Sequence, residues 1–172
     1  MTITAPEPSH DGFDRVCQHL QAQGHAHPAQ WLHTPARTCQ EAAEALGLQT
    51  GQIAKSVIFK RKSDNRAVLV VASGDQRVDE KKVAALVGPI GRADADFVKA
   101  QTGFSIGGVS PVAHLHPPVT LVDDTLFRFN EVWAAAGHPN GVFRCSPQDL
   151  LRLTGAPSAD VAQKAQAAQP SP

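Results

Sequence analysis

A lysine at the start of an apolar run is the first residue whose type and position suit chemistry. Lys55 opens the segment "KSVIF" and follows the glycine-containing stretch "LQTGQIA". A lysine ammonium is a compact point charge that suits a phosphate or a polarised carbonyl. The alternative is that Lys55 only caps a strand and reaches solvent. Its spacing alone leaves both interpretations open.

A glycine-rich loop is the second feature, at residues 103–111, "GFSIGGVSP". Glycine adopts positive φ and lets another molecule approach the main chain, while proline fixes φ and removes a donor. The loop is either an ordinary turn or a strip of backbone donors for a carbonyl oxygen or a sugar. His138 stands in another such loop, "AAGHPNG", where it either contacts a substrate group or is merely exposed.

Metal and nucleophile chemistry fit the sequence less well. The chain has eight histidines and three cysteines, yet only His114 and His116 have spacing that converges, and no further ligands stand near them. We therefore predict no metal and no cofactor. Four serines stand near the candidate segments: Ser56, Ser73, Ser105 and Ser110. Only Ser105, in "GFSIG", has the GxSxG spacing, and no sequence argument pairs any of them with a histidine and a carboxylate, which argues against a serine nucleophile.

Composition places limits on the class of protein. The chain has 172 residues, 42% of them hydrophobic and 19% charged, which is typical of one globular domain. Its formal net charge is zero, so any contact with nucleic acid must be local. No apolar run approaches the roughly 20 residues that span a bilayer, and three widely spaced cysteines suit reduced thiols. We expect a cytoplasmic protein without membrane contact.

The elements that must position these residues can be read from periodicity and caps. Thr38 with Glu41 predicts a capping box, and Ser146 with Pro147 predicts another helix start. Two β-branched runs around the turn "SDN" predict a hairpin whose second strand is central in a sheet. The expected helices are 13–24, 38–47, 79–88, 94–103 and 146–155, and the expected strands are 54–62, 66–74, 119–124, 127–132 and 141–146.

These elements together predict an α+β fold with prominent antiparallel pairing and helices packed on the sheet. The ends of the chain are rich in Pro, Ala and Gln. We therefore expect a flexible N-terminus over 1–12, a single domain over 13–157 and a flexible tail over 158–172.

The order of five segments resembles the YbaK family, the editing domains related to the insertion domain of bacterial prolyl-tRNA synthetase. The resemblance covers about residues 28–157 and rests on "TCQEAAEALGLQTGQIAKSVIFK", "AVLVVASGDQRVDEKKVAALVG", "ADADFVKAQTGFSIGGVSPVAH", "VTLVDDTLFRFNEVWAAAG" and "SPQDLLRLTG". It implies a strongly curved, mixed and largely antiparallel sheet, barrel-like and surrounded by helices. It also implies hydrolysis of the ester that joins a wrong amino acid to a transfer RNA.

The resemblance also implies site residues. The family's characteristic lysine maps onto Lys55, and its GxxxP loop maps onto Gly107, Gly108, Val109, Ser110 and Pro111. By analogy, the Gly107 and Gly108 amides hold the ester carbonyl, and Lys55 anchors a phosphate near the terminal adenosine. Ser56 stands where some members that clear alanyl-tRNA carry Asn, and His138 falls where relatives use a histidine to shape the amino-acid pocket. Water then attacks the ester without a protein nucleophile.

The functional expectation is a free-standing aminoacyl-tRNA deacylase that edits in trans. Its expected partner is the acceptor end of a mischarged tRNA, with tRNA-Pro favoured, assisted by prolyl-tRNA synthetase or an elongation factor. The expected amino acid is small, such as Ala, Cys, Ser, Thr or 2-aminobutyrate, because synthetases discriminate poorly between side chains that differ by one methylene. Two alternatives remain: a non-catalytic module that binds a tRNA end or another nucleotide, and a protein-interaction domain.

Overall fold

The computed structural model describes residues 10–163, and five helices and eight strands lie within that range. Of the expected flexible segments, 1–12 and 158–172, the parts 1–9 and 164–172 lie outside the described residues. The helices are α1 (Asp11–Ala22), α2 (Cys39–Leu46), α3 (Glu80–Val87), α4 (Ala95–Thr102) and α5 (Pro147–Thr154). The longer strands are β2 (Ile53–Arg61), β3 (Ala67–Ser73), β5 (Val119–Asp123), β6 (Val132–Ala135) and β7 (Gly141–Cys145). The short strands are β1 (Gln30–Trp31), β4 (Ile90–Arg92) and β8 (Ser158–Ala159).

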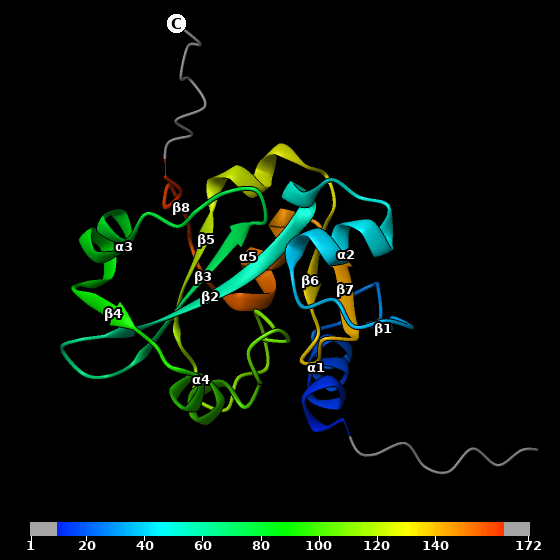
Figure 1. Cartoon of the computed structure of the whole chain (residues 1–172), viewed down its shortest axis with the longest axis horizontal. Helices are drawn as coiled ribbons and strands as arrows, with labels where there is room; N and C mark the ends of the chain where they lie inside the picture. The colour runs from blue at the N-terminus through cyan, green and yellow to red at the C-terminus, as the bar shows by residue number, and fades with distance from the viewer. Residues whose placement is uncertain (1–9, 164–172) are drawn as a thin grey trace, which may run out of the picture.

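All of these strands belong to one mixed sheet in the order β1-β7-β6-β2-β3-β5-β8, with β4 also paired to β2 (Figure 1). The β2–β3 hairpin is antiparallel, as predicted. β2 with β6, β3 with β5 and β5 with β8 are parallel. The α+β prediction is confirmed, although the sheet stays open and does not close into a barrel.

The β2 strand has an interrupted edge. β3 runs along one edge of β2 from Ala54 to Lys60. On the opposite edge β6 pairs only with Ile53 and Ala54, and β4 pairs only with Phe59–Arg61. Residues 55–58 therefore have a neighbouring strand on one side only.

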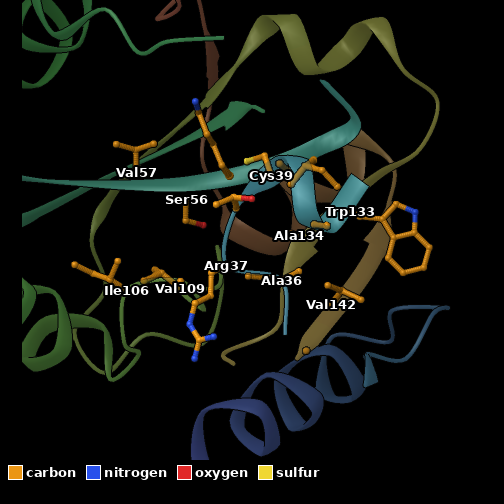
Figure 2. A pocket seen from close by; sticks show the side chains of 18 of the residues that line it. Ala36, Arg37, Cys39, Ser56, Val57, Ile106, Val109, Trp133, Ala134 and Val142 are labelled. Carbon is orange, nitrogen blue, oxygen red and sulfur yellow. The ribbon is translucent and has the colours of Figure 1, made fainter. Parts of the chain in front are cut away.

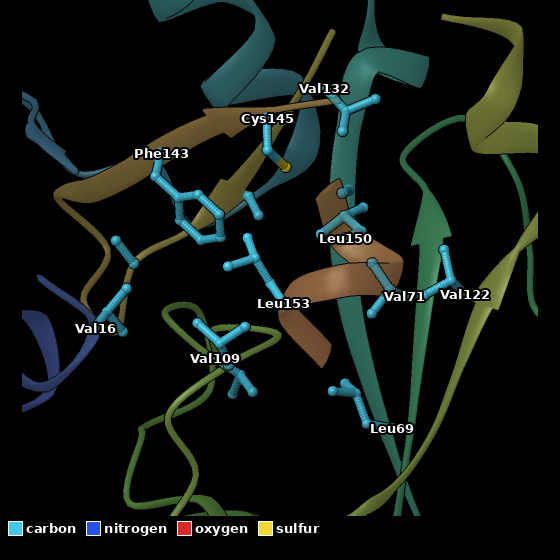
Figure 3. Packing of buried hydrophobic residues seen from close by; sticks show 14 of the residues in the cluster. Val16, Leu69, Val71, Val109, Val122, Val132, Phe143, Cys145, Leu150 and Leu153 are labelled. Atoms are coloured by element: carbon cyan, nitrogen blue, oxygen red, sulfur yellow. The ribbon is translucent and has the colours of Figure 1, made fainter. Parts of the chain in front are cut away.

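The β3 strand is the centre of the core, and all seven of its residues are buried. Its alternating side chains feed two apolar clusters. Leu69 and Val71 pack in the cluster that contains residues of α1, α4 and α5 (Figure 3). Val68 and Val70 pack in the cluster that contains Val83 of α3. The sheet thus has helices on both faces, which explains why β3 is apolar throughout.

The predicted helix starts are confirmed at α2 and α5. The Thr38 hydroxyl accepts a hydrogen bond from the Glu41 amide at 3.1 Å, and the Ser146 hydroxyl accepts one from the Asp149 amide at 3.0 Å. The strand predicted over 127–132 is wrong for most of its length, because residues Asp124–Arg128 form a 3-10 helix that the Asp123 carboxylate caps. β6 begins only at Val132.

The packed part of the chain extends beyond both ends of the predicted domain. α1 begins at Asp11, and β8 pairs with β5 after residue 157. The buried Asp123 carboxylate accepts a hydrogen bond from the Val161 amide at 3.1 Å, and Val161 is fully buried. These short contacts were not predicted because the sequence at both ends of the chain is rich in Pro and Ala. No helix of residues 10–163 is long and apolar enough to cross a membrane.

We predict that Asp123→Asn lowers the free energy of unfolding by roughly 2 kcal/mol, because a buried carboxylate that accepts several hydrogen bonds would be replaced by an amide. Asp123 accepts hydrogen bonds from Thr125 and from the Val161 amide. Urea unfolding measures the effect. Asp124→Asn is the matched control, since Asp124 is exposed. Equal stability of the two variants would contradict the assignment of Asp123 as the attachment of the C-terminal segment.

Candidate functional site

A cavity of about 410 Å³ opens between α2, the interrupted edge of β2, the strands β6 and β7, and the 103–111 loop (Figure 2). This volume is in the range of small-molecule sites. One part of the wall is apolar and consists of Ala36, Ala42, Ile53, Trp133, Ala134 and Val142. The remaining wall carries the polar and loop residues Arg37, Cys39, Lys55, Ser56, Ile106 and Gly107.

The gap in the β2 edge forms part of this wall. The Ile53 carbonyl accepts from the Gly74 amide, and the Arg61 amide donates to the Arg66 carbonyl, so odd-numbered residues of β2 direct their backbone groups toward β3. Even-numbered residues direct theirs toward the other edge. The N–H and C=O groups of Ser56 consequently face the gap, and Ser56 lines the cavity.

The Ser56 side chain adds a third polar group at the same place. Its hydroxyl is buried and makes no hydrogen bond within residues 10–163. A buried polar atom without a partner costs about 1–3 kcal/mol, and native proteins retain few of them. Ser56 therefore lines the cavity and carries a buried hydroxyl without a partner among the described residues, and its role as a substrate-binding residue stays a prediction.

Lys55 also lines the cavity, with its ammonium held at one side. Its Nζ donates to the Gln76 carbonyl at 2.5 Å. Burial raises the pKa of the neighbouring Cys39 thiol, and the Lys55 charge only partly opposes that effect. Cys39 is therefore a neutral thiol and a poor nucleophile. Cys17, Cys39 and Cys145 are all free.

The predicted loop begins with a tight turn. The Gly108 amide donates to the Ser105 carbonyl at 3.0 Å, and Gly107 has a φ of +98°. This geometry fits a type II turn with glycine at its third position. The Gly107 amide makes no hydrogen bond within the described residues, and Gly107 lines the cavity. Of the two glycines, Gly107 is therefore the one whose amide is not used within the described residues.

Gly108 has a different role from the one predicted. Its amide is already used by Ser105, and the residue is buried outside the cavity wall. A Cβ at this position would lie 2.8 Å from the Cα of His138. Glycine is required there because the two loops pack backbone against backbone.

The remaining predicted residues also divide into those that line the cavity and those that do not. Val109 lines the cavity, whereas Ser110, Pro111 and His138 do not. The Ser110 carbonyl accepts a hydrogen bond from His114 Nε2 at 2.7 Å, and its hydroxyl accepts one from the Val112 amide at 3.2 Å. Ser110 and buried Pro111 thus hold the loop in shape.

His138 lies outside the cavity wall, in a cluster of rings. The ring centroids of His10, Trp31 and His138 are 4.4–4.9 Å apart in every pair. Burial, the neighbouring His10 and the charge of Arg37 lower the pKa of His138. His138 therefore acts on the site through its packing against Gly108 and through these rings.

The support behind the loop comes from α1 and α4. Arg15 donates to the carbonyls of Ala113 at 3.0 Å and Thr102 at 2.8 Å, and its guanidinium lies 4.5 Å from the centroid of the Phe104 ring. A Cβ on Gly12 would lie 2.4 Å from the Gly137 carbonyl oxygen, so α1 packs directly on the His138 loop. These contacts link the N-terminal helix to the cavity.

Several cavity residues were missed by the sequence analysis. Arg37, Cys39, Ile106 and Trp133 line the cavity but were not predicted. Arg37 and Cys39 flank the Thr38 helix cap, so their proximity to the predicted helix start was the available signal. Within residues 10–163, no group of three or more His, Cys, Asp or Glu side chains is arranged to hold a metal ion.

Comparisons with known proteins agree with this architecture. A family model described as "Aminoacyl-tRNA editing domain" matches residues 33–153. The uncharacterized protein YwhH of Bacillus subtilis (strain 168) is 35% identical over 124 residues, which cover 72% of this chain and 78% of YwhH. The proline--tRNA ligase of Limosilactobacillus fermentum is 32% identical over 96 residues, which cover 53% of this chain but only 17% of the ligase.

A solved structure described as a candidate trans-editing enzyme for prolyl tRNA synthetase superposes with a TM-score of 0.82 at 39% identity. The match covers 94% of this chain and 99% of that one. This chain belongs to the aminoacyl-tRNA editing domain family, and it is related to the corresponding domains of prolyl-tRNA synthetases.

The partly buried His114 behind the loop predicts a pH dependence of stability. Burial lowers the pKa of His114 to about 4, against roughly 6.5 for an unfolded histidine. Protonation between these values favours the unfolded chain, so stability is complete above about pH 6.5 and falls as the pH drops toward 4. The loss attributable to His114 is on the order of 2–3 kcal/mol. Urea unfolding of the parent and of His114→Asn from pH 7 to pH 4.5 measures it.

His116→Asn is the matched control, because His116 is exposed on the same segment. In His116→Asn, the free energy of unfolding should fall with decreasing pH as steeply as in the parent. In His114→Asn, it should depend less on pH. Parallel pH profiles for the parent and His114→Asn would contradict this account.

Proposed function

We propose that this chain is a free-standing aminoacyl-tRNA deacylase that hydrolyses the ester of a mischarged tRNA in trans. The observation that carries the proposal is that three residues line one cavity: Ser56 in the β2 gap, Lys55, and Gly107 with its unused amide. Membership of the editing-domain family supports this reaction class. The likeness to a candidate trans-editing enzyme supports action in trans.

The apolar part of the cavity is the proposed binding site for the amino-acid side chain of the substrate. Ala36, Ala42 and Val142 contribute no hydrogen-bonding side chain there. The Thr38 hydroxyl already bonds Glu41. A hydroxyl on the substrate would lose its hydration without a partner in this part of the wall. We therefore assign small aliphatic or thiol side chains, namely Ala, 2-aminobutyrate and Cys, ahead of Ser and Thr.

The α-amino group of the substrate is assigned to Ser56. Its hydroxyl lacks a partner and its backbone carbonyl faces the gap, so an α-ammonium can donate to both acceptors. Hydrogen bonds between a charged donor and a neutral acceptor are stronger than hydrogen bonds between two neutral groups. This contact would hold the ester near Gly107.

The hydrolysis itself needs no protein nucleophile. A water oxygen attacks the carbonyl carbon of the ester, and the negative charge that develops on the carbonyl oxygen is stabilised by the Gly107 amide and the Lys55 charge. The bond from the carbonyl carbon to the ribose oxygen then breaks. The ribose oxygen takes up the proton lost by water, which leaves a free amino acid and an uncharged tRNA. The adjacent ribose hydroxyl of the substrate helps to position the water.

The proposed carrier is tRNA-Pro, because the chain is related to prolyl-tRNA synthetases. With a net charge of zero, the protein has little general attraction for RNA. We therefore propose recognition of the acceptor end, with prolyl-tRNA synthetase or an elongation factor as delivering partner.

A non-catalytic binding module is the second candidate. The contact between Lys55 Nζ and the Gln76 carbonyl favours it, because an ammonium that stays there would not act on an ester. The open cavity beside Lys55 gives no support to a protein-interaction domain with a blocked site.

The first test is single-turnover deacylation of tRNA-Pro carrying Ala, 2-aminobutyrate, Cys, Ser, Thr or Pro. We expect rapid hydrolysis of Ala, 2-aminobutyrate or Cys, with Pro spared. Lys55→Ala should be slower by about 10²-fold, which is typical for loss of one charge-stabilising group, with unfolding changed by less than about 1 kcal/mol. Lys62→Ala is the control, since Lys62 is exposed and outside the cavity. Hydrolysis at only the spontaneous rate across the panel would reject the deacylase proposal in favour of the binding module.

A second prediction concerns the α-ammonium. N-acetylation of the aminoacyl group removes the charge and replaces the donors that Ser56 would accept, so the acetylated ester should be hydrolysed at least about tenfold more slowly. Ser56→Ala should reduce this preference for the free amine, because one acceptor is lost. Equal rates for both esters with the parent protein would show that Ser56 does not bind the α-ammonium.

A further inference from the structure

Arg37 is a cation at the cavity mouth that the site chemistry described so far does not use. It is exposed, lines the cavity and directly precedes the Thr38 cap of α2. A Cβ at Gly107 would lie 3.6 Å from Arg37 Cγ, so the stem of Arg37 runs beside the turn that carries the free amide. Figure 2 shows the guanidinium beside Val109 and pointing away from Ser56.

Arg37 differs from most other arginines of residues 10–163 because it has no polar partner. Six arginines bond carboxylates or backbone carbonyls: Arg15, Arg61, Arg66, Arg128, Arg144 and Arg152. The side chains of Arg37, Arg77 and Arg92 make no hydrogen bond or ion pair within the described range. Of these three, only Arg37 lines the cavity. Its five guanidinium donors are therefore available to a ligand at the mouth.

The two cations of the cavity lie on different elements and have different surroundings. The Lys55 ammonium is held by the Gln76 carbonyl, next to the end of β3. Arg37 instead lies beside Gly107, and its charge also acts on His138 in the ring cluster. An ester held between Ser56 and Gly107 would leave its nucleotide portion outside the cavity, on the side of Arg37.

We propose that Arg37 is a positioning residue that binds the phosphate on the 5′ side of the terminal adenosine of the tRNA. This inference rests on the proposed function, since it requires the aminoacyl end to enter the cavity. A guanidinium matches the geometry of a phosphate through two parallel N–H···O bonds, which places the nucleotide as well as attracting it. This assigns to Arg37 the phosphate contact that the family resemblance had suggested for Lys55.

The test compares substrates with and without that phosphate. Alanyl-tRNA and the trinucleotide ester alanyl-CCA carry it, whereas 3′-O-alanyl-adenosine does not. For the first two, Arg37→Ala should lower kcat/KM by about 10- to 100-fold, mainly through KM, because a hydrogen-bonded charge is lost. For alanyl-adenosine the parent and the variant should agree within about twofold. Arg37→Lys should recover part of the loss.

Arg92→Ala is the matched control, because it removes an exposed, unpaired arginine outside the cavity. It should leave alanyl-CCA hydrolysis unchanged. Arg37→Ala should also reduce the slope of log affinity against log salt by about 0.7, the value for one single-strand phosphate contact. An equal loss on alanyl-adenosine and alanyl-CCA, or no loss on either, would overturn the assignment.

A binding measurement separates this inference from the deacylase proposal. The amide analogue 3′-alanylamido-adenosine cannot be hydrolysed as an ester, and it can be prepared with or without a 5′-phosphate. The phosphate should tighten binding to the parent by about tenfold and give no advantage with Arg37→Ala. This result would support the role of Arg37 even if the ester panel showed no turnover. A phosphate advantage that persists in Arg37→Ala would reject it.

Discussion

The site depends on an interruption in the hydrogen bonding of one strand. β2 is paired along the whole of one edge, but β6 and β4 share its other edge and leave residues 55–58 between them. A strand edge without a partner exposes backbone donors and acceptors. Here that edge is enclosed by α2 and the 103–111 loop, which turns it into the wall of a cavity. The fold thereby presents a polar strip within apolar surroundings.

The loop opposite this strip is held by close backbone contacts between segments far apart in sequence. Gly12 packs on Gly137, and the backbone of His138 packs on Gly108. His114 donates to the Ser110 carbonyl within the 103–111 loop, and Arg15 donates to the carbonyls of Thr102 and Ala113 that flank it. A position held by so many short contacts has little freedom to move, which is what a preorganised amide at Gly107 requires. The first helix, although distant in sequence, is therefore part of the site's support.

Much of this fold could be predicted from sequence because its signals are local. The caps at Thr38 and Ser146 and the apolar β3 strand were found from spacing and composition. The three strands of two or three residues could not be found in this way, since their pairing is set by distant partners. For the same reason Gly107 and Gly108 were predicted to share one role, because the loop that packs on Gly108 is distant in sequence. In the structure Gly107 lines the cavity, and Gly108 packs on the His138 loop. Arg37 was missed because its role depends on the approach of Gly107 from seventy residues away.

A crystal structure of the protein with 3′-alanylamido-adenosine 5′-phosphate would test the central claim most directly. The account predicts that the alanyl group lies in the β2 gap, with its amino group on the Ser56 hydroxyl and carbonyl and its acyl oxygen on the Gly107 amide. An alanyl group bound elsewhere on the protein, with the gap between β6 and β4 left without ligand contacts, would contradict it.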